Sequence, residues 1–183
     1  MASKKVIFLL QRILNETSND DRVLSLRAAN EAKKKLADAH AMLRSIAHEL
    51  VGPNFWRYAH QISSGLQEYI EALSFAHYVE HGGLVSYEQA QANLCDDSSQ
   101  PVGRAYMPSF APTLMRKSPR FRLQLFPLPL SDYVLGICDL TGELMRLAIS
   151  SISKPNGRMK ASQISLFVRG CKAGKDMFEY ISD

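Results

Sequence analysis

Two long segments with almost no helix breakers constrain the fold more than any other feature of the sequence. From Asp20 to Val51 there is neither glycine nor proline, and apolar residues recur with a broken 3.6-residue period. Gly52-Pro53 ends this segment, and a second one runs from Asn54 to His81, before Gly82-Gly83. Helices of this length bury their apolar faces most readily against one another. The pattern therefore predicts an all-α fold.

Shorter helices are expected around these two. They are predicted from Lys4 to Leu14, from Ser86 to Leu94, from Ser131 to Ile152 with Ser131 and Asp132 as caps, and from about Ala161 onward. Together the segments predict one domain over residues 1–183, a bundle of long antiparallel helices. The last helix reaches Asp183 without a stop signal, so we expect it to be truncated.

A proline-rich, basic connection interrupts the helical pattern at about residues 95–130. Six of the eight prolines lie there, and five lysines or arginines occur between Arg104 and Arg122 with no acid among them. One extended run, "FRLQLF", does not make a sheet. We interpret this segment as a connection within the domain, because the helix after it needs partners.

The composition excludes several classes of protein. Hydrophobic residues make up 46% and charged residues 22%, which is ordinary for a globular chain. No apolar run reaches the ~18 residues of a membrane-spanning helix, and "VIFLL" is too short for a signal peptide. Three distant cysteines fit neither disulfides nor a zinc site. We therefore expect an intracellular, cytoplasmic protein with no membrane partner; its net charge of +4 permits an anionic partner without demanding one.

Two glutamates lie together on the second long helix. On a helical wheel of Gly65–Glu80, Glu68 and Glu71 are opposite the main apolar face. Phe75 and Val79 lie on the same side as the two acids. A solvated face would not normally carry these apolar residues, so this side is predicted to be covered by another helix or another subunit.

A second acidic strip lies on the helix from Asp132 to Ile149, which is otherwise mostly apolar. Its polar residues are Asp132, Asp139, Glu143 and Arg146. Gly136 and Gly142 flank the strip, and glycine in a helix costs roughly 1 kcal/mol relative to alanine. Their presence indicates close approach by another group. Acids on a buried helix are also costly unless they are paired or bind a metal.

If the two helices face each other, Glu68, Glu71, Asp139 and Glu143 converge. Clustered carboxylate oxygens suit Mg²⁺, with Mn²⁺ as the alternative, and such an ion could activate water against a phosphodiester. The pattern alone leaves other interpretations open. The glutamates could form a solvated face, and Glu143 could make a local salt bridge with Arg146.

Several motifs resemble the translin/TRAX family, in particular its translin-associated factor X branch. They are "SKKVIFLLQRI" (Ser3–Ile13), "HELVG" (His48–Gly52), "GLQEYIEALSFAHYV" (Gly65–Val79), "DYVLGICDLTGELMR" (Asp132–Arg146) and, more loosely, "SQISLFVRG" (Ser162–Gly170). The resemblance is collinear over nearly the whole chain. It implies a translin-like helical bundle that assembles with translin into a closed hetero-oligomeric shell.

The resemblance also implies an activity. It implies a Mg²⁺-dependent endoribonuclease that cleaves single-stranded RNA, with single-stranded DNA as an alternative ligand. The implied settings are RNA interference and tRNA processing. Carried over by motif, the catalytic and metal-binding residues are Glu68, Glu71, Asp139 and Glu143. Relative to the family, an extended basic N-terminal segment and a further C-terminal helix are expected to be missing, and with them any nuclear-targeting signal and part of the oligomer contact. The expected location is the cytoplasm, with the nucleus as the alternative.

Basic residues are the candidates for contacting RNA phosphates. These are Lys33, Lys34, Arg120, Arg122 and Arg146, although lysines on a helix commonly face water and Arg146 could serve a salt bridge. His77 and His81 could bind zinc, but a position at the edge of the core is the stronger interpretation. The Glu-x-x-His motif of ferritin-like di-metal oxidoreductases is absent from this sequence, which argues against that class of enzyme. A non-catalytic subunit that binds nucleic acid or translin remains the alternative function.

Overall fold

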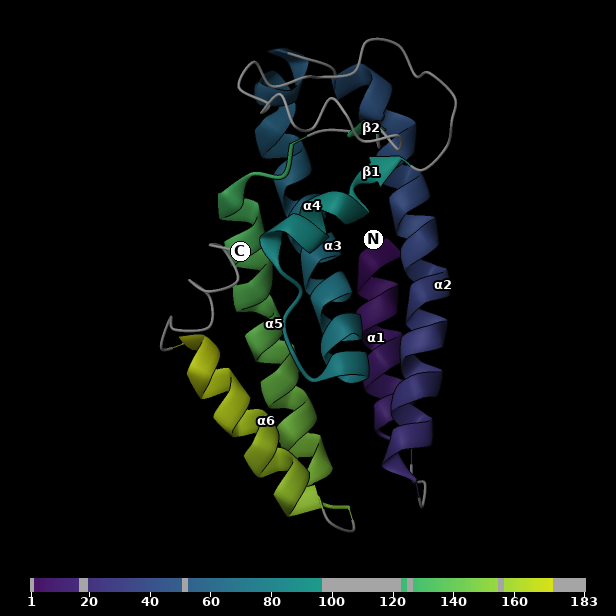
Figure 1. The fold of residues 1–183 in the computed structure, drawn as a ribbon, viewed down its shortest axis with the longest axis vertical. Coiled ribbons are helices and arrows are strands. Elements are labelled where there is room, and N and C mark those ends of the chain that lie inside the picture. The colour runs from purple at the N-terminus through teal and green to yellow at the C-terminus, as the bar shows by residue number, and fades with distance from the viewer. Residues whose placement is uncertain are drawn as a thin grey trace, which may run out of the picture.

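The computed structural model describes residues 2–16, 20–50, 53–96, 123–124, 127–154 and 157–172, and confirms the all-α prediction. Figure 1 shows the elements in chain order. They are α1 (Ala2–Leu14), α2 (Asp21–Ala47), a 3₁₀ turn η1 (His48–Leu50), α3 (Pro53–His81), α4 (Tyr87–Asn93), β1 (Cys95–Asp96), β2 (Leu123–Gln124), α5 (Leu130–Ser151) and α6 (Gly157–Lys172). The two strands form one two-residue antiparallel pairing.

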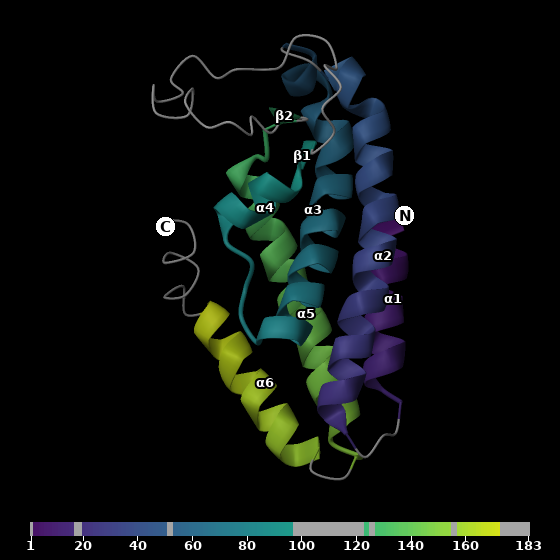
Figure 2. The ribbon, with the colours of Figure 1, turned by 45° about the vertical axis from the view of Figure 1, so that its right-hand side comes forward.

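Helix α3 is at the centre of the bundle. It packs against α1, α2 and α5, while α6 packs on the outer side of α5 (Figures 1 and 2). Consecutive helices α1, α2 and α3 alternate in direction, as the sequence predicts. Helix α5 instead runs in the same direction as α3, because the segment after α3 returns the chain to the end where α3 began (Figure 1). This parallel pairing sets the register between the two acidic segments.

Local sequence explains where the helices begin and end. The side chain of Asp20 accepts hydrogen bonds from the backbone N–H groups of Arg22 and Val23 and so caps α2. Ser86 and Gln89 form a capping box at the start of α4. Helix α3 ends where Gly82 adopts a φ of 78°, a conformation that glycine tolerates without strain.

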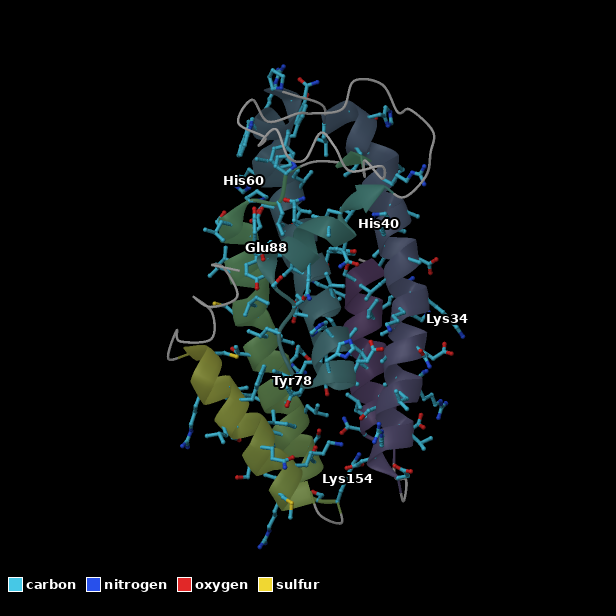
Figure 3. All side chains as sticks on the ribbon, in the orientation of Figure 1. Lys34, His40, His60, Tyr78, Glu88 and Lys154 are labelled. Carbon is cyan, nitrogen blue, oxygen red and sulfur yellow. The ribbon has the colours of Figure 1, made fainter. Side chains whose placement is uncertain are left out.

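The core lies between α3 and the helices around it. Tyr133, Phe55 and Phe75 are its largest fully buried side chains, and the hydroxyl of Tyr133 donates to the carbonyl of Val85 at 2.8 Å. The burial of Phe75 confirms that the side of α3 carrying Glu68 and Glu71 is covered. Tyr78 and Phe167 join α3 to α6 by a ring contact of 4.6 Å, and Figure 3 shows Tyr78 on the side of the bundle that faces α6.

Three details differ from the prediction. Asp132 does not cap α5, which begins at Leu130 after Pro129 without a side-chain cap. Helix α2 gives way to a 3₁₀ turn after Ala47, and α6 begins at Gly157 rather than near Ala161. Most of the predicted proline-rich connection lies outside the described residues. Among those described, no helix is both long and apolar enough to cross a membrane.

Candidate metal centre

The acidic segments of α3 and α5 are brought together by an unusually close helix contact. A Cβ atom added to Gly136 would lie 2.8 Å from both the carbonyl oxygen of Gln67 and the Cβ atom of Ile70. Only glycine leaves room for the α3 backbone at this position. Gly136 therefore confirms the close approach expected from the sequence, whereas Gly142 has nothing within 4 Å of its added Cβ.

Asp132 does not join the other acids of the predicted strip. It is buried at the start of α5, where its Oδ1 accepts hydrogen bonds from Ser63 Oγ at 2.5 Å and Gln67 Nε2 at 2.8 Å. Both donors belong to α3. Asp132 thus fastens the first turn of α5 to α3, two helical turns before Asp139.

Helix α1 supplies two side chains that sequence reasoning did not assign to the site. Lys4 Nζ lies 3.0 Å from Glu68 Oε1. Gln11 Nε2 donates to both the carbonyl oxygen of Glu143, at 2.9 Å, and its Oε2, at 3.0 Å. The available signal was that Gln11 is the one uncharged polar residue within the apolar run "VIFLLQRIL".

Glu71 occupies the centre of this acidic cluster. Burial, followed by the negative charges of Asp139, Glu143 and Glu68, raises the pKa of the Glu71 carboxyl to about 7. The ammonium of Lys4 acts in the opposite direction but does not offset these effects. The carboxylates of α3 and α5 therefore share one electrostatic environment that contains more negative than positive charge.

The residues present fit a hard divalent cation. Carboxylate oxygens are the donors that Mg²⁺ and Mn²⁺ prefer, and the uncompensated charge at Glu71 favours a cation. Gln11 is only 9% exposed, and its Oε1 is a buried oxygen with no hydrogen-bond partner. Within the described residues, no three acidic, histidine or cysteine side chains yet form a group that could hold a metal. Binding would therefore require the carboxylates to come closer together than they lie here.

Comparison with known proteins agrees with the all-α fold. The family model described as "Translin family" matches residues 1–183. The chain belongs to the translin family.

Relatives within the translin family carry the name translin-associated protein X. The chain is 32% identical to the Mus musculus protein over 91% of its own length and 33% identical to the Rattus norvegicus protein over the same share. A homologue from Schizosaccharomyces pombe is 29% identical over 98% of this chain. The chain spans 54% of the length of the two mammalian relatives and 62% of the yeast one.

Three of the predicted RNA-contacting residues are already paired with acids in this translin-family chain. Lys33 Nζ lies 2.7 Å from Glu80 Oε1, and Lys34 Nζ lies 3.0 Å from Glu31 Oε1. Figure 3 shows Lys34 pointing outward from α2. Arg146 Nη2 lies 3.5 Å from Glu143 Oε1, the salt bridge considered from the sequence. Arg120 and Arg122 lie outside the described residues.

The histidine pair of α3 has the predicted position at the edge of the core. His77 is half-buried, and its Nδ1 lies 3.1 Å from the carbonyl oxygen of Gly83. The rings of His77 and His81 are 4.6 Å apart, and His81 Nε2 lies 3.6 Å from Glu80 Oε2. These contacts account for both side chains as structural residues at the end of α3.

The raised pKa of Glu71 predicts how stability depends on pH in the metal-free chain. The folded state holds the Glu71 proton up to about pH 7, whereas the unfolded state releases it near 4.5. The stabilising contribution is therefore complete below about pH 4.5 and is lost as the pH rises towards 7. Glu71→Gln should remove this decline from urea unfolding curves recorded in EDTA, and Glu88→Gln, on the exposed surface of α4, should retain it. Identical pH profiles for wild type and Glu71→Gln would contradict the assignment.

Proposed function

We propose that this chain is the catalytic subunit of a metal-dependent endoribonuclease that works in a hetero-oligomer with translin and cleaves single-stranded RNA. One observation carries the proposal: the half-buried Glu71 is surrounded by the negative charges of Asp139, Glu143 and Glu68. Such clusters are retained at a cost to stability, and a divalent cation relieves that cost. A purely structural bundle has no need of one.

The proposed ligands are Glu68, Glu71 and Asp139, with Glu143 beside them, and the proposed ion is Mg²⁺ or Mn²⁺. When bound, such an ion neutralises charge on a phosphodiester and makes water a better nucleophile. The protein's own part is positional. Gln11 holds the carboxylate of Glu143 in place, and Gly136 keeps α5 close enough to α3 for Asp139 to act on Glu71.

The proposed partner follows from the names of the relatives, which describe them as translin-associated. RNA-interference passenger-strand removal and tRNA processing are the proposed settings, in the cytoplasm and, as the alternative, the nucleus. A non-catalytic subunit that only binds RNA or translin is the competing function. Such a subunit would retain its binding properties without any dependence on the carboxylates.

Removal of the metal tests the proposal directly. The chain reconstituted with translin should cleave single-stranded RNA in Mg²⁺, stop in EDTA, and recover when excess Mg²⁺ is restored. Translin alone is the control for contaminating nuclease. Equal cleavage with and without EDTA would contradict the metal-dependent mechanism, and a complex that assembles but never cleaves would favour the non-catalytic alternative.

A further inference from the structure

We propose that the groove between α1 and α2 binds one nucleotide of the RNA strand, with the ring of Phe8 stacked on the base and with Lys5, Arg12 and Lys35 at the phosphates. The groove has a volume of about 680 Å³ and is lined by α1 together with Lys35 of α2. This inference rests on the proposed function, because it names where that function's substrate binds.

Phe8 is the first observation behind the inference. Its side chain is 77% exposed, although neighbouring apolar residues of α1, such as Ile7 and Leu10, are buried. Packing within this chain therefore does not explain an aromatic residue at this position. A flat aromatic ring beside cationic side chains is the combination that proteins use to stack and hold unpaired bases.

The charges of the groove are the second observation. Lys5, Arg12 and Lys35 line it, and no acid does. In the part of the chain that the structure describes, none of the three forms an ion pair, whereas Lys33 and Lys34 both do. The acid one turn before Lys35 is Glu31, and its carboxylate accepts a hydrogen bond from Lys34 at 3.0 Å. The three cations of the groove therefore remain available for phosphate groups.

The groove and the acidic cluster share one residue. Gln11 lines the groove and also donates to Glu143, so one side chain borders both sites. Lys4, one helical turn before Phe8, pairs with Glu68. A nucleotide stacked on Phe8 would therefore place an adjacent phosphodiester beside the proposed metal ligands. The groove would fix the position of the strand, and the carboxylates would act on its neighbouring bond.

The test measures binding without cleavage. The chain with translin is titrated into a fluorescent single-stranded oligouridylate in EDTA, and affinity is read from anisotropy. Phe8→Leu, which keeps the apolar character and loses the flat ring, should weaken binding by about 5- to 100-fold, the range expected for one stacked base. Phe8→Tyr should restore binding to within about twofold of wild type.

Two results would overturn the inference. One is wild-type affinity for Phe8→Leu. The other is a smaller particle in size-exclusion chromatography for Phe8→Leu, because that would assign Phe8 to a contact between subunits. Neither result depends on whether the complex cleaves RNA, so failure of this inference is distinguishable from failure of the proposed activity.

The cations are tested by the salt dependence of the same titration. Combined Lys5→Ala, Arg12→Ala and Lys35→Ala should reduce the magnitude of the slope of log affinity against log salt concentration by about 1.4, since one nucleotide has two flanking phosphates and each phosphate contact on a single strand contributes about 0.7. The matched control removes three exposed arginines elsewhere, Arg22, Arg158 and Arg169. An equal loss of slope in both variants would show general electrostatic attraction and would contradict a specific groove.

Discussion

Combined replacement of Glu68, Glu71 and Asp139 by alanine is expected to abolish RNA cleavage by the complex with translin, lowering the rate at least about 1,000-fold. The substitutions remove the carboxylate oxygens proposed to hold the ion, and with it the charge neutralisation of the phosphodiester. They also remove mutual repulsion around Glu71, so the variant should fold and assemble. Single-turnover cleavage of a labelled RNA, with saturating complex in Mg²⁺, measures the effect.

A matched control separates this effect from a general change of charge. Glu31, Glu49 and Glu88 are acids away from the cluster, and alanine at all three should leave cleavage within about twofold of wild type. Anisotropy in EDTA should show that the site variant still binds RNA. Cleavage that survives the loss of Glu68, Glu71 and Asp139 would show that the active site lies elsewhere.

Alanine at Gly136 is expected to lower the free energy of unfolding by about 1–3 kcal/mol. The added methyl group would meet the Gln67 carbonyl and the Ile70 side chain at 2.8 Å, so α5 must move away from α3. The same substitution at Gly142 meets nothing and should raise stability by up to about 1 kcal/mol, because alanine favours the helix. Urea unfolding in EDTA measures both.

The comparison between the two glycines makes the prediction specific. Gly136→Ala should also reduce cleavage, since α5 carries Asp139 and Glu143, whereas Gly142→Ala should not. Equal stability of the two variants would show that the helices can separate at no cost. It would also contradict the view that their close contact sets the geometry of the acidic cluster.

Local patterns predicted the helices because each one carries its own signals. Asp20, Ser86 and Gly82 act as the caps and stop that their chemistry favours. The covered position of Phe75 followed from periodicity, since the helical wheel places Phe75 on the same side of α3 as the two acids. The meeting of Glu71 with Asp139 was a conditional inference, which depended on two helices packing in one particular register.

Non-local contacts account for what the sequence did not disclose. Asp132 is a residue type that commonly caps helices, but here its carboxylate accepts hydrogen bonds from Ser63 and Gln67 of α3. Gln11 could not be connected to Glu143 by any spacing rule, because the two residues are 132 positions apart. Likewise, Gly136 and Gly142 have the same local pattern, and only the path of α3 distinguishes them.

The contacts between the first and the last helices described in the chain have a consequence for synthesis on the ribosome. Lys154 donates to the carbonyl oxygens of Leu14, at 2.7 Å, and Glu16, at 3.2 Å, and Figure 3 shows it at the end of the bundle where α5 passes into α6. Helices α1, α2 and α3 can pair as soon as they emerge. The hydrogen bond between Gln11 and Glu143 can form only after the 132 positions that follow Gln11 have been synthesised, a delay on the order of ten seconds at ordinary elongation rates. The acidic cluster is therefore only half assembled until α5 has left the exit tunnel, and the charge that favours a cation arises only then.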